Sequence, residues 1–268
     1  MKDKVVIITG GSSGIGKALA RQFGEKGSKI VITGRRIEEL NQTVEELKQK
    51  GIEIIACQSD VTNLQDNLKM VEAAINAYGK IDVLINNAGI SMRALFQDVE
   101  LKVIHQVMDI NFFGAVNATH CCLPHILKTK GSIIGISSTA GYRGLPGRTG
   151  YSASKFALNG FLEALRTELH KSGVHVLTAC PGFTSSNIRK RSLTKDGTNQ
   201  GESPREEEKM MSAEECAMHI YKATVRRKKT LILTIEGKLT VFLNKWMSGY
   251  LDKLVYKSMA KENKSPFK

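Results

Sequence analysis

The chain has 268 residues, enough for one large domain with a sizeable apolar core. Its formal net charge is +13, yet no nucleic-acid-binding motif accompanies the charge, so nucleic-acid binding is not expected. The five cysteines show no metal-ligand spacing, which predicts free thiols and no metal site. Neither a signal peptide nor an apolar stretch of membrane-spanning length is found, which predicts a cytoplasmic protein.

The N-terminal residues predict a nucleotide site. Residues 4–9 form a short apolar, β-branched run that is typical of a buried strand. The turn Gly10-Gly11-Ser12-Ser13-Gly14-Ile15-Gly16 follows, and a helical pattern begins directly after it. A glycine-rich turn between a strand and a helix lets backbone N–H groups approach a pyrophosphate. The segment therefore indicates dinucleotide binding.

The second predicted strand, residues 29–33, ends in Gly34-Arg35-Arg36. An acidic residue that would hold the ribose hydroxyls of NAD is missing here, and arginine suits a 2′-phosphate. This favours NADP(H) over NAD(H). The alternative is that the arginines are solvated residues at the start of the next helix, a reading that fits Arg36 better than Arg35.

Strand-like and helical patterns alternate along the rest of the chain. The further strands are predicted near 53–57, 81–85, 131–137, 174–180 and 230–235, and the helices over 38–50, 64–78, 101–128 and 151–171. This alternation predicts a single α/β domain, a Rossmann-type doubly wound parallel sheet of about seven strands. Such sheets bind ligands at the carboxyl ends of their strands.

The helix predicted from residue 151 begins with a tyrosine and a lysine four residues apart. This spacing places Tyr151 and Lys155 on one helix face, about one turn apart. An ammonium group beside a phenol favours the phenolate and lowers the pKa of the phenol, which would suit a proton donor and acceptor. The same spacing also arises by chance on exposed helix faces.

The ordered set of motifs resembles the short-chain dehydrogenase/reductase family over roughly residues 3–236. The shared motifs are Thr9-Gly10-x-x-x-Gly14-x-Gly16, Asp60-Val61, Asn86-Asn87-Ala88-Gly89, Asn111, Ser138, Tyr151-x-x-x-Lys155 and Pro181-Gly182.

The resemblance implies a catalytic set of four residues. Tyr151 would be the acid/base, and Lys155 would lower its pKa and hold the nicotinamide ribose. Ser138 would bind the substrate oxygen, and Asn111 would anchor a proton-relay water. The implied cofactor contacts are Gly10, Ser12, Ser13, Gly14, Ile15, Gly16, Arg35, Arg36, Asp60, Val61, Asn87, Ala88, Gly89, Tyr151, Lys155, Pro181, Gly182 and Thr184.

Two positions depart from the family pattern. Ser13 stands where many NADP-preferring members have a basic residue, so the cofactor preference depends on Arg35. The threonine expected after Pro181-Gly182 is either Thr184 or a neighbouring serine.

The implied activity is NADPH-dependent interconversion of a carbonyl and a secondary alcohol in a small molecule. A non-catalytic dinucleotide sensor and a sugar-nucleotide epimerase are the alternatives, although a sensor has no need of a tuned phenol. The family's substrate lid corresponds to residues 185–211, and residues 140–148 would form the opposite wall, with Tyr142 and Leu145 as candidate contacts.

Residues 237–268 form a basic extension to the dehydrogenase domain of residues 1–236. From residue 222 onward there are twelve Lys or Arg residues and three acidic ones. Between residues 239 and 259 the apolar residues recur at i, i+3 and i+4, which predicts one amphipathic helix of about six turns.

Three interpretations of this helix compete. It packs on the protein's own core or on a twin subunit, it lies in a membrane interface at the cytoplasmic face, or it covers an apolar substrate. Ketosphinganine reductases and hydroxysteroid dehydrogenases are similar in joining the family core to an apolar C-terminal extension. That resemblance implies a lipid-like substrate, such as a keto-acyl, sphingoid or steroid ketone.

The resemblance also implies self-association. Family members pair through helices that correspond to residues 101–128 and 151–171, which predicts a homodimer or homotetramer.

Overall fold

The computed structural model describes residues 1–267 and contains one seven-stranded parallel sheet. The strand order is β3-β2-β1-β4-β5-β6-β7. The strands are β1 (Val5–Thr9), β2 (Lys29–Gly34), β3 (Ile54–Gln58), β4 (Val83–Asn86), β5 (Ser132–Ile136), β6 (His175–Cys180) and β7 (Thr230–Ile232). The predicted fold class is confirmed, and the order reverses between β1 and β4.

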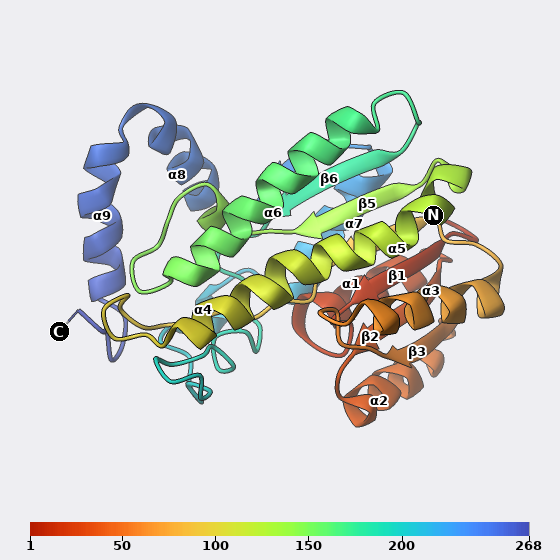
Figure 1. Cartoon of the computed structure of the whole chain (residues 1–268), viewed down its shortest axis with the longest axis horizontal. Helices are drawn as coiled ribbons and strands as arrows, with labels where there is room; N and C mark the ends of the chain where they lie inside the picture. Colours follow the sequence, from red (N-terminus) through yellow and green to blue (C-terminus); the bar gives the residue numbers. More distant parts are fainter. Residues whose placement is uncertain (268) are drawn as a thin grey trace.

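Helices cover both faces of the sheet (Figure 1). The first face carries α1 (Gly14–Gly24), α2 (Ile37–Lys48) and α7 (Ala213–Val225). The second carries α3 (Leu64–Tyr78), α5 (Gly114–Thr129) and α6 (Thr149–Glu168). A shorter helix, α4 (Leu101–Met108), leads toward α5 and packs beside α6.

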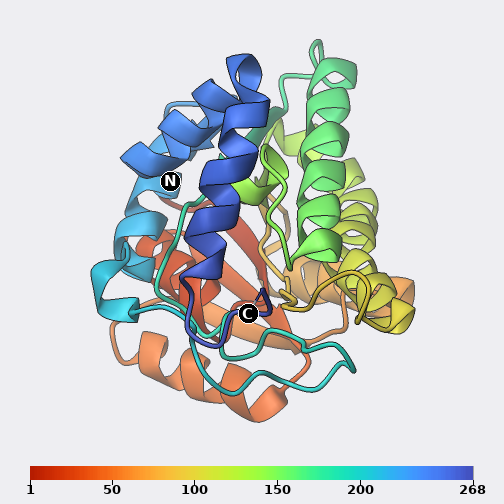
Figure 2. The same cartoon turned by 90° about the vertical axis from the view of Figure 1, so that its left-hand side faces the viewer.

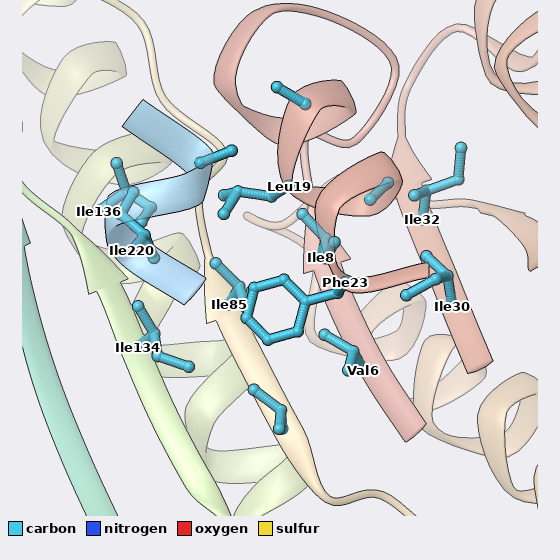
Figure 3. Close-up of a cluster of buried hydrophobic side chains, with 14 of the residues drawn as sticks. Val6, Ile8, Leu19, Phe23, Ile30, Ile32, Ile85, Ile134, Ile136 and Ile220 are labelled. Carbon is cyan, nitrogen blue, oxygen red and sulfur yellow. The ribbon is translucent and has the colours of Figure 1, made fainter. Parts of the chain in front are cut away.

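The apolar strands divide their side chains between two cores because successive residues of a strand point to opposite faces. Val6 and Ile8 of β1 belong to the core under α1 and α7, whereas Ile7 belongs to the core under α5 and α6. Figure 3 shows Phe23 of α1 reaching down onto the first face, among side chains of several strands. Since Phe23 is fully buried, this contact fixes α1 and therefore the glycine turn before it.

The predicted helix over residues 101–128 is interrupted. A π-helix, Asp109–Phe113, separates α4 from α5. Within it, the Asn111 side chain is held by the backbone of Ile90 and by Ser154 of α6. These contacts come from other parts of the chain, so periodicity within the segment did not reveal the interruption.

The predicted strand over 230–235 ends at Ile232. Thr234 has a φ of 64°, and its hydroxyl accepts a hydrogen bond from Gly237 N–H (3.0 Å), which caps the start of a helix. The chain thus leaves the sheet early and enters the C-terminal extension.

The prediction of one six-turn helix over residues 239–259 was wrong. The extension contains two helices, α8 (Ile235–Trp246) and α9 (Ser248–Ala260), which meet at Met247. The Ser248-Gly249 pair after the break has low helix propensity, which explains why the helix does not continue. Figures 1 and 2 show both helices, in blue, beyond one end of the sheet. Among residues 1–267, no helix is both long and apolar enough to cross a membrane.

Candidate active site

A cavity of about 970 Å³ opens at the carboxyl ends of the strands, where the strand order reverses. All of the predicted cofactor residues line it, from the glycine turn to Thr184. Ser138, Tyr151 and Lys155 line the same cavity, whereas Asn111 lies behind its wall. Its volume is at the upper end of the range for small-molecule sites, about 300–1,000 Å³.

The glycine turn has a conformation that side chains would prevent. Gly10 and Gly14 have φ values of +65° and +53°, in the left-handed region. A Cβ atom on Gly16 would lie 2.2 Å from the carbonyl oxygen of Gly10. The N-terminus of α1 therefore opens onto the cavity with no side-chain cap from Ser13. This arrangement fits the pyrophosphate of a dinucleotide.

Asn87 braces the glycine turn from the next strand of the sheet. Its side-chain amide donates to the carbonyl oxygens of Thr9 (2.9 Å) and Gly10 (3.1 Å). In return, the Thr9 hydroxyl accepts hydrogen bonds from the backbone N–H groups of Asn87 and Ala88, both at 3.0 Å. These bonds join the ends of β1 and β4 at the cavity floor.

The two arginines after β2 differ in their surroundings. Arg36 donates to Glu39 on α2 (Nη2 to Oε2, 2.8 Å), and Arg191 approaches the same carboxylate at 3.2 Å. The Arg35 side chain is exposed at the cavity, and among residues 1–267 it forms no hydrogen bond or ion pair. Arg35 is thus available for a phosphate group, whereas Arg36 serves the start of α2.

The catalytic candidates come from two neighbouring elements. Ser138 follows β5, and its hydroxyl accepts a hydrogen bond from Ala140 N–H (3.1 Å). Tyr151 and Lys155 lie in the first turns of α6, with the Lys155 Nζ 5.7 Å from the centroid of the tyrosine ring. Lys155 donates to the carbonyl oxygen of Ile136 at 2.9 Å, which anchors it to the end of β5.

The pKa of Tyr151 differs in direction from the expectation. Burial raises the pKa of Tyr151 above its usual value, although hydrogen bonding with the Ser138 side chain opposes the rise. Burial also lowers the pKa of Lys155 to about 8. With a pKa of about 8, Lys155 stays largely protonated at neutral pH and keeps its positive charge beside the phenol.

Asn111 uses its side chain to join two walls of the site. Its amide donates to the Ile90 carbonyl and to the Ser154 hydroxyl, each at 2.9 Å, and its carbonyl accepts from Ile90 N–H at 2.8 Å. The loop after β4 is thereby tied to α6 behind Lys155. The role of Asn111 in holding a relay water stays a prediction.

The C-terminal extension supplies an apolar wall. Six of its apolar side chains line the cavity: Leu239, Leu243, Leu251, Leu254, Val255 and Met259. Leu145 lines the cavity as predicted, whereas Tyr142 lies outside the lining, and its carbonyl accepts a hydrogen bond from Asn244 of α8 at 2.9 Å. The extension therefore lies over the site of its own chain.

Residues 185–211 are held by side-chain contacts. Arg189 is buried and donates to Glu207 (Nε to Oε1, 2.6 Å) and to the carbonyl oxygen of Thr184 (2.6 Å). Thr184 itself is buried, and its bridge to Met211 closes the base of the segment. This segment lines the cavity opposite α6, where a substrate lid was predicted.

Besides Arg35 and Arg36, five arginines line the cavity that sequence reasoning did not place in the site: Arg143, Arg148, Arg189, Arg191 and Arg205. Their carboxylate partners are far away in the sequence, so no local pattern marks them. Among residues 1–267, no group of three His, Cys, Asp or Glu side chains is arranged to hold a metal ion.

The chain is similar in sequence to known dehydrogenases and reductases. Residues 4–197 match the sequence model of the family described as short chain dehydrogenase. The chain is 33% identical to dehydrogenase/reductase SDR family member 7B of Mus musculus, in an alignment of 99% of this chain and 84% of the relative. It is 39% identical to 11-beta-hydroxysteroid dehydrogenase-like 2 of Arabidopsis thaliana, over 69% of this chain and 60% of the relative.

Solved structures show the same fold. A short chain dehydrogenase/reductase from Burkholderia phymatum, in complex with NAD, superposes with a TM-score of 0.84 at 24% identity, covering 93% of this chain and 95% of that one. An alcohol dehydrogenase from Thermococcus sibiricus, complexed with 5-hydroxy-NADP, gives a TM-score of 0.75 at 22% identity, over 86% of this chain and 95% of that one.

Proposed function

Since the chain belongs to the short-chain dehydrogenase/reductase family of NAD(P)-dependent oxidoreductases, we propose that it reduces the carbonyl group of an apolar, lipid-like small molecule with NADPH. One observation carries the proposal. Ser138, Tyr151 and Lys155 line a single cavity that has the glycine turn at one side and the apolar residues of α8 and α9 at another. A dinucleotide and a greasy carbonyl compound would meet at the catalytic side chains.

The residues of the chain divide the chemical work. A bound nicotinamide supplies the hydride. The Ser138 hydroxyl donates a hydrogen bond to the substrate oxygen, on which negative charge develops, and the Tyr151 hydroxyl transfers its proton to that oxygen. Lys155, anchored on Ile136, holds the ribose and adds positive charge beside the phenol.

The pKa of Tyr151 is compatible with a role as proton donor. Because burial raises this pKa, the phenol keeps its proton near neutral pH. A protonated phenol is the form that a developing alkoxide needs, whereas oxidation of an alcohol needs a phenolate. NADPH is the matching cofactor, since Arg35 is available for its 2′-phosphate.

The substrate class follows from the cavity wall. Leu243, Leu251 and Val255 offer hydrocarbon contacts next to the catalytic side chains. Burial of a hydrocarbon chain against such a wall contributes about 0.8 kcal/mol per methylene group. Keto-acyl, sphingoid and steroid ketones have the hydrocarbon surface that this wall would cover.

The first test is the reduction of ketones of graded chain length by the wild-type protein and by Tyr151→Phe. We expect NADPH oxidation by the wild type to rise with chain length, and the variant to lose at least about 10³-fold in kcat while it retains NADPH binding. Tyr221→Phe is the control, because Tyr221 lies on α7 and packs against Phe23.

Two outcomes would contradict the proposal. Substantial turnover by Tyr151→Phe would remove the tyrosine from the mechanism. Tight NADPH binding by a wild-type protein that reduces no ketone would favour the dinucleotide sensor instead.

We also propose that the protein forms a homodimer through α4, α5 and α6. Leu101 of α4, Phe113 of the π-helix between α4 and α5, and Phe156 of α6 are exposed apolar side chains, and Phe113 is 50% exposed. Phe112 of the π-helix connects it to α6: the centroid of its ring lies 6.3 Å from that of Phe161 and 4.9 Å from that of the neighbouring Phe113. Burial of the exposed side chains against a second copy would remove them from water.

The outer surface of α8 and α9 suits a membrane interface, which we propose as the second contact of the extension. Phe242 and Trp246 are 63% and 70% exposed on α8, and Tyr250 is exposed at the start of α9. Exposed lysines lie along the same two helices, at positions 238, 245, 253 and 257. Aromatic side chains at the interface with lysines near anionic headgroups are typical of peripheral binding.

A further inference from the structure

Glu262 forms the centre of a buried charge cluster at the end of the C-terminal extension. The residue is 5% exposed. Its Oε2 accepts a hydrogen bond from Arg148 Nη2 at 2.8 Å, and its Oε1 accepts one from Arg205 Nε at 2.7 Å. Arg93 Nε lies 3.5 Å from the same carboxylate. Three guanidinium groups thus share one carboxylate.

Each arginine comes from a different segment near the active site. Arg93 lies on the loop after β4, Arg148 immediately precedes α6 and Arg205 lies in the segment of residues 185–211. Arg148 is three residues before Tyr151 and lines the cavity, as does Arg205. Figure 2 shows the end of the chain, in dark blue, beside the teal segment that contains residues 185–211. Backbone contacts already join these segments to one another, through the bridge between Met92 and Leu193 and the hydrogen bond from Ala94 N–H to the Gly147 carbonyl oxygen (3.0 Å). Glu262 adds the end of the C-terminal extension to them.

The contacts around Glu262 reach back into the extension. Arg148 Nη1 approaches the sulfur of Met259 at 3.4 Å, and Met259 is a buried residue of the cavity wall. Arg93 also donates to the carbonyl oxygen of Asn263 at 2.7 Å. The end of α9 is thereby fixed where its apolar residues complete the cavity.

The ionised carboxylate is essential to this arrangement. Burial alone would raise the pKa of Glu262, but Arg148 and Arg205 hold that pKa below its ordinary value. Loss of the charge would leave buried guanidinium groups without a counter-ion, which is strongly unfavourable. The segments would then separate until water reaches the arginines.

We propose that Glu262 is a positioning residue that fastens α8 and α9 over the substrate half of the active site. It contacts neither the glycine turn nor the catalytic side chains, so its effect is on the binding of extended substrates. This inference rests on the proposed function, because the closed wall matters only for an apolar substrate that contacts it.

The test compares Glu262→Gln with Glu262→Asp and with a matched control, Lys264→Gln, in the full-length protein. Lys264 lies on the same terminal segment as Glu262. It pairs with Glu202 of the segment of residues 185–211 at 2.6 Å, but both side chains are largely exposed. Amide hydrogen exchange of residues 248–260 is measured first, because it needs no substrate. We expect Glu262→Gln to lose about tenfold in protection there, with the sheet unchanged and Lys264→Gln equal to the wild type.

The second readout is steady-state reduction of a long-chain and a short-chain ketone by NADPH. Glu262→Gln should raise the KM of the long ketone about tenfold with little change in kcat or in NADPH affinity, and Glu262→Asp should recover part of the loss. The short ketone should show no such change.

Unchanged exchange of residues 248–260 in Glu262→Gln would overturn the proposal. So would loss of protection throughout the sheet, since that would show only a general structural role. If the wild-type protein reduced no ketone, the proposed function would fail, yet the exchange measurement would still decide whether Glu262 fastens the extension.

Discussion

Arg35 and Arg36 are adjacent in the sequence but have different partners in the structure. Arg36 is committed to Glu39 on its own helix, and Arg35 faces the cavity without a carboxylate partner among residues 1–267. The sequence already favoured Arg35 for the 2′-phosphate, and the pairing of Arg36 with Glu39 three residues later agrees with that preference. The cofactor preference should therefore depend on Arg35.

The variant Arg35→Ala tests this assignment. We expect its KM for NADPH to rise about 10- to 100-fold, since a charge-assisted hydrogen bond contributes about 1.5–3 kcal/mol. The KM for NADH should change little. Arg36→Ala serves as the control, and an equal loss of NADPH preference in that variant would contradict the assignment.

Lys155 is buried at the site, and burial lowers its pKa to about 8. In the unfolded chain the ordinary pKa is about 10.4, so between these two values the unfolded state binds more protons than the native state. Lys155 consequently costs stability below pH 8, and the cost falls as the pH rises through this window.

Urea unfolding of the cofactor-free wild type and of Lys155→Met at pH 7.5 and pH 9.5 measures the effect. The unfolding free energy of the wild type minus that of the variant should increase by about 2 kcal/mol between the two pH values. Thiols that are buried in the native state, such as Cys122, are the same in both proteins, so their contribution to the unfolding free energy cancels in the difference. A difference that stays constant or decreases would contradict the burial of a charged lysine.

The break between α8 and α9 decides what the apolar residues of the extension contact. The sequence periodicity correctly indicated helices with apolar faces, but a single six-turn helix does not form. Because the chain turns at Met247, Leu243 before the break and Leu251 after it both line the cavity. Phe242 points outward from the same helix as Leu243 and is exposed.

This division of faces predicts different effects for two substitutions. Leu251→Ala should raise the KM for long-chain ketones about tenfold, because a hydrophobic contact of this size contributes about 1–3 kcal/mol to substrate discrimination. Short-chain ketones should be affected little. The matched variant Phe242→Ala should match the wild type in this assay, and an equal effect of both substitutions would place the substrate elsewhere.

The features that the sequence predicted correctly are those that depend on neighbouring residues in the chain. The buried run of β1, the glycine turn after it and the spacing of Tyr151 and Lys155 all express local rules, and the structure brings them together at one cavity. The π-helix around Asn111 and the cluster around Glu262 depend on contacts with residues far away in the chain. Local patterns contain no information on such contacts, which is why they were missed.

At the scale of the whole molecule, the outside of α8 and α9 combines exposed aromatic side chains with basic ones. Most of the net charge of +13 lies in residues 222–268, where twelve Lys or Arg residues stand against three acidic ones, and Phe242 and Trp246 are exposed in the same segment. Electrostatic attraction alone would be weak at physiological salt, and the aromatic side chains would add the apolar contribution.

Co-sedimentation with vesicles tests the membrane contact. The wild-type protein should pellet with vesicles that contain phosphatidylserine and much less with phosphatidylcholine alone. The double substitution Phe242→Ser and Trp246→Ser should reduce pelleting about tenfold or more, because it removes the inserted side chains but leaves the lysines in place. Equal pelleting of both proteins, or no pelleting of the wild type, would remove the membrane interpretation.

The separation between the strand ends and the terminal helices has a consequence for substrate specificity. In the proposed reaction, hydride transfer depends on side chains fixed by the sheet and α6, while much of the apolar wall of the cavity comes from α8 and α9. Substitutions confined to α8 and α9 should thus alter which compounds are accepted without disturbing the redox chemistry. Under this arrangement, acceptance of a new substrate requires changes in two helices that the sheet does not need for its own packing.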